Sequence, residues 1–266
     1  MSMTRDKADK LYWDRTWDNA PLPRVINPYA RDLNNYVYRK FHEFFREVLS
    51  QKETKDKKLL EIGCARSIWL PYFVKEFGFK VYGIDYSEIG CHQAMQILLN
   101  EGLRGEVIHS DFFSPPEFMI GAFDVVVSLG VVEHFQDTVG CVGMLTKFLK
   151  PGGILITNIP NLIGLVGLVQ KYFNRDIFNI HVPLSAENLG DAHRRNGLHL
   201  ILCHYFLVAN FGILNLENLK GNACWAWILP LRSWISKAIW VCEKSIPFLR
   251  PNRWSSPYIN CVAMKP

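Results

Sequence analysis

The clearest chemical pattern in this sequence is a set of acidic residues that end short apolar runs. Glu61 and Gly63 close the run KLLEIG, and Asp85 closes the run KVYGID, 22 residues after Gly63. Gly63 permits a tight turn, after which backbone amides open toward the start of the next helix. A carboxylate at the distance of Asp85 can accept hydrogen bonds from both hydroxyl groups of a ribose. These residues therefore indicate a nucleotide site.

A third acidic residue continues this pattern. Asp111 ends the run GEVIHSD and is followed directly by Phe112 and Phe113. An acid beside aromatic rings suits the exocyclic amine and the flat face of an adenine. Because ligands of open α/β sheets bind outside the carboxyl ends of the strands, all these side chains are expected to border one cleft.

The segments that carry these residues alternate between strand-like and helix-like patterns. This alternation, with nearly continuous apolar strands, is typical of a parallel sheet that helices cover on both faces. Amphipathic spacing predicts a further helix over 31–50, ahead of the first strand. The predicted strands lie at 58–63, 80–85, 105–111, 123–130, 152–160, 199–208 and 257–266. The predicted helices between the first five strands lie at 68–77, 87–100 and 137–149.

Composition and charge narrow the class of protein. A chain of 266 residues with 49% hydrophobic residues is long and apolar enough for one large α/β domain with additions. The net charge of +5 comes without a dense basic run, so nucleic acid is not an expected partner. Seven scattered cysteines without a C-x-x-C pair, and a charged N-terminus where a signal peptide would be apolar, indicate a cytoplasmic protein.

The order and spacing of these motifs resemble the class I S-adenosylmethionine-dependent methyltransferases, over about 58–160 and again at the last strand. In that family an acidic-x-Gly-x-Gly-x-Gly turn follows strand one, and acids end strands two and three. FDVVVSLGVVEHF and LKPGGILITNIPN are similar to the family's fourth and fifth strands. The resemblance implies a Rossmann-like, doubly wound, seven-stranded, mostly parallel sheet with S-adenosylmethionine as cofactor. The cofactor-binding residues that it implies are Glu61, Gly63, Ala65, Ser67, Asp85, Tyr86, Asp111, Phe112, Ser128 and Leu129.

The turn after strand one departs from the family pattern. Ala65 and Ser67 stand where the second and third glycines are usual. A nicotinamide dinucleotide site would need those glycines for its pyrophosphate, and Glu61 would lie near two phosphates. Glu61 can instead serve the ammonium group of methionine, so S-adenosylmethionine is the favoured ligand. Arg66 has two open interpretations: a solvated side chain, or a contact with the methionine carboxylate.

Histidines are the candidates for acid-base chemistry. Methyl transfer mainly requires a held acceptor and excluded water, and it needs a base only when a weakly acidic acceptor enters protonated. His134, in VVEHF after strand four, is the first candidate, and shaping the cleft or capping a helix is its alternative role. Glu133 is expected to be structural. His181 is the second candidate, because relatives build the acceptor pocket in the insertion after strand five. The remaining histidines lack metal-ligand spacing, so no metal is expected; they are His42, His92, His109, His193, His199 and His204.

The N-terminal residues 1–57 are expected to form a helical lid segment. Tyr12, Trp13 and Trp17 lie ahead of the predicted helix over 31–50. In resembling enzymes such a segment covers the cofactor and excludes water. Aromatic packing against the outside of the sheet is the alternative.

Two insertions are expected within the methyltransferase domain over 58–266. The first, about 160–195, should wall the acceptor pocket with an apolar helix at 162–173. The second, about 215–256, carries a stripe at helical spacing that includes Trp227, Leu231, Trp234, Ala238 and Val241. Packing as core or cover is the expected fate of this stripe, while a homodimer contact and a membrane surface are alternatives. In the membrane alternative, Trp234 and Trp240 are expected to contact lipid.

The sequence thus predicts transfer of a methyl group to a small, partly apolar organic acceptor. Oxygen is the first hypothesis for the receiving atom and nitrogen the second, because SLGVVEH stands where an Asn/Asp-Pro-Pro-Tyr motif marks many N-methyltransferases. One alternative is a lipid or quinone methyltransferase at a membrane surface. Another is a non-catalytic protein that binds S-adenosylmethionine and holds a partner.

Overall fold

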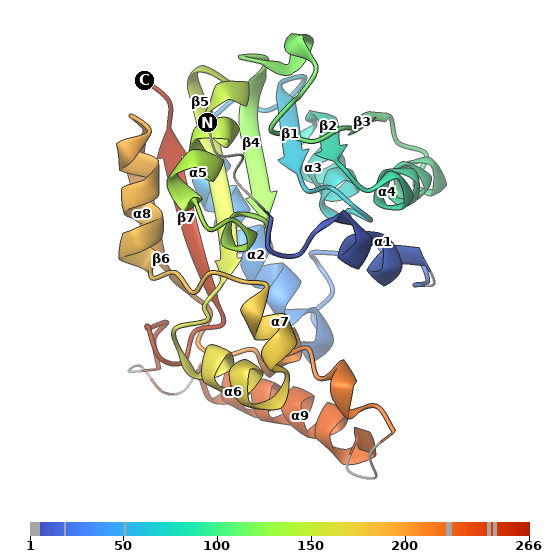
Figure 1. Ribbon diagram of the computed structural model, residues 1–266, viewed down its shortest axis with the longest axis vertical. Helices are drawn as coiled ribbons and strands as arrows, with labels where there is room; N and C mark the ends of the chain where they lie inside the picture. The colour runs from blue at the N-terminus through green and yellow to red at the C-terminus, as the bar shows by residue number, and fades with distance from the viewer. Residues whose placement is uncertain (1–5, 19, 51, 222–224, 244–245, 247–248) are drawn as a thin grey trace.

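The computed structural model describes residues 6–18, 20–50, 52–221, 225–243, 246 and 249–266 (Figure 1). The charged extreme N-terminus over 1–5, Cys224 and parts of the second insertion lie outside the described residues. A seven-stranded sheet in the order β3-β2-β1-β4-β5-β7-β6 forms the centre of the molecule. Strand β7 runs antiparallel to both of its neighbours, and the other strands are parallel to one another. The Rossmann-like fold with a mostly parallel sheet is confirmed.

The strands fall where near-continuous apolar runs predict them. A strand that is buried on both faces needs apolar side chains at successive positions, and this is the pattern of β1 and β4. The strands are β1 Lys58–Ile62, β2 Lys80–Asp85, β3 Gly105–His109, β4 Phe123–Leu129, β5 Leu149–Pro160, β6 His199–Phe206 and β7 Tyr258–Met264.

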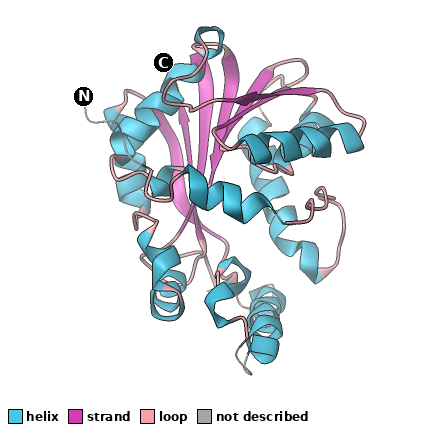
Figure 2. Ribbon diagram, turned by 45° about the vertical axis from the view of Figure 1, so that its right-hand side comes forward, coloured by secondary structure: helices cyan, strands magenta, loops and turns pink. Residues whose placement is uncertain are grey.

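Helices cover both faces of the sheet (Figure 2). Leu59 and Leu60 are neighbours in β1 and both fully buried, since successive side chains of a strand point to opposite faces. Leu59 joins a core with α2 and α3, and Leu60 joins one with α5 and α8. The helices that cover the sheet are α2 Tyr36–Leu49, α3 Trp69–Phe77, α4 Glu88–Asn100, α5 Thr138–Phe148 and α8 Ala186–Arg195.

The remaining helices belong to the additions expected around the sheet. Helix α1 packs near α4, and the N-terminal end of its segment pairs with the loop after β4. Helices α6 and α9 lie side by side at one end of the molecule (Figure 1), where Ile228 packs against a small apolar cluster that includes Val166 of α6. These helices are α1 Lys10–Asp18, α6 Leu165–Phe173, α7 Arg175–Asn179 and α9 Trp225–Glu243. Short 3-10 helices are η1 Leu33–Asn35, η2 Glu117–Met119, η3 Val132–His134, η4 Phe211–Ile213 and η5 Glu217–Leu219.

Two further properties hold for the described residues. The cysteines within them are all free thiols. Within those residues, no helix has both the length and the apolar character needed to cross a membrane.

Candidate functional site

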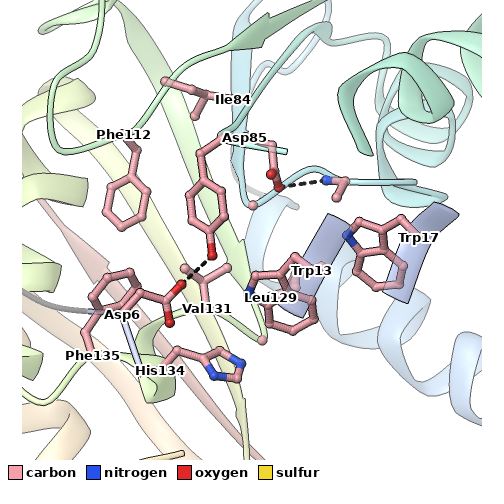
Figure 3. Close-up of a pocket in the computed structure, with 14 residues that line it drawn as sticks. Asp6, Trp13, Trp17, Ile84, Asp85, Phe112, Leu129, Val131, His134 and Phe135 are labelled. Carbon is pink, nitrogen blue, oxygen red and sulfur yellow. Dashed lines mark hydrogen bonds between the residues drawn. The ribbon is translucent and has the colours of Figure 1, made fainter. Parts of the chain in front are cut away.

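A cavity of about 260 Å³ lies at the carboxyl ends of the central parallel strands. We call it the strand-end cavity. Gly63 and Ala65 border it from the turn after β1, Asp85 from the end of β2, and Leu129 from the end of β4. Trp13 closes it from the N-terminal segment (Figure 3). The sheet topology thus brings together residues that the sequence places at separate strand ends.

Asp85 is held in a fixed position at the wall of this cavity. Its carboxylate accepts hydrogen bonds from the amide of Ala65 at 3.1 Å and from the amide of Ser87 at 2.7 Å. Burial raises the pKa of Asp85 to about 6, although both amide donors lower it. The bond from the Ala65 amide is one of the dashed lines in Figure 3, where it ends on the labelled Asp85. A ligand that donates a further hydrogen bond to this carboxylate would therefore stabilise its charged form.

Gly63 is required by the geometry of the same turn. Its φ of 71° is left-handed, and a Cβ there would lie 2.5 Å from Cγ2 of Val131. A side chain would therefore be strained and would also displace a residue that lines the strand-end cavity. Ala65, at the expected second glycine position, borders the cavity with only a methyl group.

Glu61 and Ser67 lie behind the turn and do not line the cavity. The Ser67 hydroxyl donates to the Glu61 carboxylate and accepts from the amides of Trp69 and Leu70, each at 3.0 Å. Ser67 thus caps the first turn of α3. Burial raises the pKa of Glu61 to about 8. The role of Glu61 toward an ammonium group stays a prediction.

The other sequence-predicted cofactor residues divide into two groups. Tyr86 and Phe112 line the strand-end cavity with Leu129. Asp111 is exposed, its carboxylate accepts from the Phe113 amide at 2.9 Å, and it does not line the cavity. Ser128 is fully buried in β4, and its hydroxyl has no hydrogen-bond partner within the described part of the chain.

Several residues that line the strand-end cavity were not predicted from the sequence, among them Asp6, Ile84, Val131 and Phe135. Ile84 and Val131 are adjacent to predicted strand ends, so their position along the chain was an available signal. Asp6 had no such signal, because its place depends on how the N-terminal segment folds back. It forms a β-bridge with Phe135 and accepts a hydrogen bond from the Tyr86 hydroxyl (Figure 3).

The N-terminal segment is tied to the site by polar contacts at several points. The amide of Lys7 donates to the carbonyl of His134 at 3.0 Å. The Ser87 hydroxyl donates to Asp14 at 2.6 Å, and the Gln93 amide donates to the carbonyl of Trp17 at 3.0 Å. Each contact joins α1 or its flanks to a strand end or to α4. The segment is therefore positioned over the strand-end cavity.

Arg66 also holds this segment. Its guanidinium donates to the carbonyl of Pro21 and lies 5.2 Å from the centre of the Trp17 ring, within the range of a cation–π contact. The residue adopts a left-handed φ of 55°, which directs this side chain from the β1 turn. The side chain whose role was open in the sequence thus connects the turn to the N-terminal segment.

His134 and His181 lie next to each other, with ring centres 4.5 Å apart. Nδ1 of His134 is 2.9 Å from the carbonyl of Ile180, and Nδ1 of His181 is 2.6 Å from that of Ile177. A carbonyl only accepts, so both rings carry their proton on Nδ1 and keep a lone pair on Nε2. Burial lowers the pKa of each ring to about 4, and both are therefore neutral at pH 7.

A second and larger cavity, of about 720 Å³, adjoins the first. We call it the aromatic cavity, because its walls include Tyr38, Phe41, Trp69, Trp240 and Tyr258. His181 and His134 line it, and the expected insertion after β5 contributes Val166 and Gln170. Five residues line both cavities: Trp13, Trp17, Leu129, Gly130 and His134. His134 therefore stands at their junction.

Comparison with known proteins gives the same class as the sequence motifs. Residues 29–202 match the model of the family described as "Methyltransferase domain". The chain is 26% identical over 283 residues to the sterol 24-C-methyltransferase ERG6B of Gibberella zeae, covering 94% of this chain and 69% of that protein. It is 29% identical over 154 residues to the ubiquinone biosynthesis O-methyltransferase of Dinoroseobacter shibae, covering 56% of this chain and 58% of that protein. The chain thus spans little more than half of the latter relative.

Solved structures support the fold. The cyclopropane synthase MmaA2 from Mycobacterium tuberculosis superposes with a TM-score of 0.63 at 15% identity, and the match covers 100% of both chains. At this level of identity the likeness concerns the architecture of the sheet and its helices, not the reaction.

Proposed function

Because this chain belongs to the methyltransferase domain family and is an S-adenosylmethionine-dependent methyltransferase of small molecules, we propose that it methylates an oxygen atom of a partly apolar acceptor. The observation that carries the proposal is the junction of the two cavities at His134. The strand-end cavity suits a nucleoside cofactor, and the aromatic cavity suits an apolar acceptor. The acceptor oxygen would meet the methyl group between them.

The residues around the strand-end cavity fit S-adenosylmethionine. Asp85 presents a carboxylate to the ribose hydroxyls, and Gly63 leaves a close approach to the turn where a Cβ would clash. Apolar side chains, among them Ile84 and Phe112, border the space for the adenine. Glu61 would attract the ammonium group of the methionine part of the cofactor from its place behind the turn. The cofactor supplies a methyl group on a positively charged sulfur, which is already a good leaving group.

The other predicted cofactor contacts are supported by fewer observations. Tyr86 and Leu129 would wall the adenosine, since both line the strand-end cavity. Ala65 would contact the cofactor through its backbone. Ser67 and Ser128 do not line the strand-end cavity, so they would support the site without touching the cofactor. A contact from Asp111 to the adenine amine would require its loop to move, because its carboxylate already accepts from Phe113.

The state of the two histidines supports an acidic acceptor. Each neutral ring keeps an Nε2 lone pair, but a pKa of about 4 makes each a weak proton acceptor. An aliphatic alcohol would not yield its proton to so weak a base, whereas a phenol, with a pKa of about 10, is far more acidic. His134, with His181 behind it, would orient the phenolic hydroxyl and take part in removing its proton.

A matched set of acceptors tests this proposal. The chain would be incubated with S-adenosylmethionine and one of three compounds: a phenol with an apolar tail, its aniline analogue, and the phenol without the tail. Mass spectrometry of the products should show O-methylation of the tailed phenol, with less product from the other two. Methylation of the aniline alone would contradict oxygen as the receiving atom.

His134→Ala tests the catalytic role directly. We expect unchanged affinity for S-adenosylmethionine by calorimetry and turnover lowered at least about a hundredfold, the usual contribution of acid-base groups. Full turnover in this variant would exclude His134 from the reaction.

A second candidate is methylation of a lipid or quinone at a membrane surface, and it is supported by exposed apolar side chains on α6 and α9. Trp227 is 77% exposed and Trp234 71% on α9, and Tyr172 is 84% exposed and Leu168 62% on α6. We call these exposed side chains together the α6–α9 face. These two helices also wall the aromatic cavity from inside through Val166 and Trp240. An acceptor embedded in a membrane could reach the cavity past this face.

The structure corrects one residue of the membrane interpretation. Trp240 is only 6% exposed, stacks on Tyr36 with ring centres 4.6 Å apart, and donates to the carbonyl of Ala209 at 2.7 Å. It therefore packs α9 onto the domain and does not contact solvent. Of the two tryptophans expected to contact lipid, Trp234 alone is on the exposed surface.

A further inference from the structure

Glu133 completes a cluster with the two histidines. Its side chain is 2% exposed, and its Oε2 has no hydrogen-bond partner within the described residues. The carbonyl of Glu133 accepts from the amide of Val182 at 2.6 Å, so the backbone joins the loop after β4 to the segment that carries His181. A buried carboxylate oxygen without a partner costs free energy unless something compensates it.

The three side chains bring nitrogen and oxygen donors close to one another. One ligand atom from each of Glu133, His134 and His181 lies within 4.8 Å of the others. Both histidines direct Nδ1–H at a backbone carbonyl, as most metal-ligating histidines do, and this leaves Nε2 for an ion. These backbone bonds fix the tautomer before any ion arrives.

We propose that Glu133, His134 and His181 form a binding site for a divalent transition-metal ion. Two imidazoles and one carboxylate suit zinc, cobalt, manganese or ferrous iron, and they suit calcium or magnesium much less, because those ions prefer oxygen ligands. Metal–ligand bonds of about 2.0 to 2.2 Å would draw the three donor atoms together by about an ångström. The unpaired oxygen of Glu133 would gain its partner in the same step.

The ion would leave a coordination position for the acceptor. All three ligands line the aromatic cavity, and His134 also lines the strand-end cavity. Three protein ligands with an open position are typical of catalytic metal sites. The role of the ion rests on the proposed function: it would bind the acceptor's hydroxyl oxygen and lower the pKa of that hydroxyl. With Nε2 of both histidines bound to the ion, the O–H bond would break with the proton passing to water instead of to His134, and the oxygen would keep the electron pair with which it attacks the methyl carbon.

Cobalt is the probe for this site, because tetrahedral or five-coordinate Co²⁺ with imidazole ligands absorbs visible light. The full chain, without a histidine tag and dialysed against a chelator, would be titrated with CoCl₂ and the ion counted by elemental analysis. We expect one Co²⁺ per chain, with visible absorption bands that Zn²⁺ abolishes on competition. Absence of a stoichiometric, zinc-displaceable ion in the wild-type chain would overturn the proposal.

Three variants assign the ion to these residues. His181→Gln and Glu133→Gln should each weaken Co²⁺ binding at least tenfold and change the absorption spectrum. His92→Gln is the matched control, because His92 is an exposed imidazole on α4 that does not line either cavity. An unchanged spectrum and affinity in both site variants would overturn the assignment.

Two further measurements keep the result independent of folding and of the reaction. Circular dichroism and S-adenosylmethionine affinity would show that each variant is folded. An anomalous difference map from a wild-type crystal soaked in Zn²⁺ should show a peak between the three side chains, and a peak elsewhere would contradict the site. Neither measurement uses an acceptor, so a failure to methylate phenols would refute the proposed function and leave the metal site standing.

Discussion

Arg66 lies with its guanidinium 5.2 Å from the centre of the Trp17 ring, and this contact joins the turn after β1 to the N-terminal segment. Trp17 lines both cavities, while Arg66 extends from the same turn as Gly63 and Ala65. Arg66, which holds the N-terminal segment in place, is therefore part of the turn that is proposed to bind the cofactor. Closure over the site and binding of the cofactor should consequently be coupled.

Arg66→Gln tests this coupling. The variant loses the cation–π contact and the hydrogen bond to the Pro21 carbonyl, together worth about 1 kcal/mol at a partly exposed site. We expect S-adenosylmethionine affinity to fall about fivefold by calorimetry, and protease cleavage near residue 20 to become faster. Arg104→Gln removes an exposed arginine away from the cavities and serves as the control. Equal affinities in the two variants would separate the segment from cofactor binding.

Asp85→Ala should weaken S-adenosylmethionine binding by about 1 to 3 kcal/mol, because ribose hydroxyls would lose a buried acceptor. Asp111→Ala is the informative comparison. Asp111 is exposed and does not line the strand-end cavity, so its removal should change affinity less than the removal of Asp85. Calorimetry at fixed pH measures both. If Asp111→Ala caused the larger loss, the loop that carries it would have to move on binding.

The sequence predicted those parts of the site that local patterns determine. Asp85 and Gly63 were identified because a strand end followed by a tight turn is a local signal. The sequence offered Glu133 only as a structural residue. Its approach to His181, on which the proposed metal site depends, is set by how a distant insertion folds back onto the loop after β4. Helical spacing alone does not say which side of α9 meets the domain. The stripe over 227–241, which was expected to pack as core or cover, is exposed, whereas Trp240, outside the stripe, is buried. Packing against Tyr36 decides this.

The stability of the ligand-free chain should fall as the pH rises from about 6.5 to 8. Burial raises the pKa of Glu61 and of Glu133 to about 8, so both hold a proton in the native state that the unfolded chain has already released. Native binding of more protons means that the free energy of unfolding decreases with pH in this window. The buried neutral histidines act in the opposite direction near their unfolded pKa of about 6.5, because the unfolded chain there still binds protons that the native rings do not, and they contribute little above about pH 7.5.

Urea unfolding at pH 6.5 and pH 8 measures this slope. Glu61→Gln and Glu133→Gln should each flatten it by up to about 1 kcal/mol per pH unit, since one proton is worth about 1.4 kcal/mol per unit. Glu88→Gln, at an exposed glutamate on α4, should leave the slope unchanged. A wild-type chain that gained stability toward pH 8 would show that both buried carboxyl groups are ionised in the native state.

The α6–α9 face should bind membranes if the acceptor is a lipid or quinone. The double variant Trp227→Ser, Trp234→Ser removes two large exposed rings without touching Trp240, and sedimentation with phosphatidylglycerol vesicles should fall at least tenfold. Phe118→Ser is the control, because Phe118 is 64% exposed on η2, away from α6 and α9. The net charge of +5 predicts weaker sedimentation with neutral phosphatidylcholine vesicles. Equal sedimentation of the wild type and the double variant would leave these tryptophans without a membrane role, and the aromatic cavity would then receive its acceptor from water.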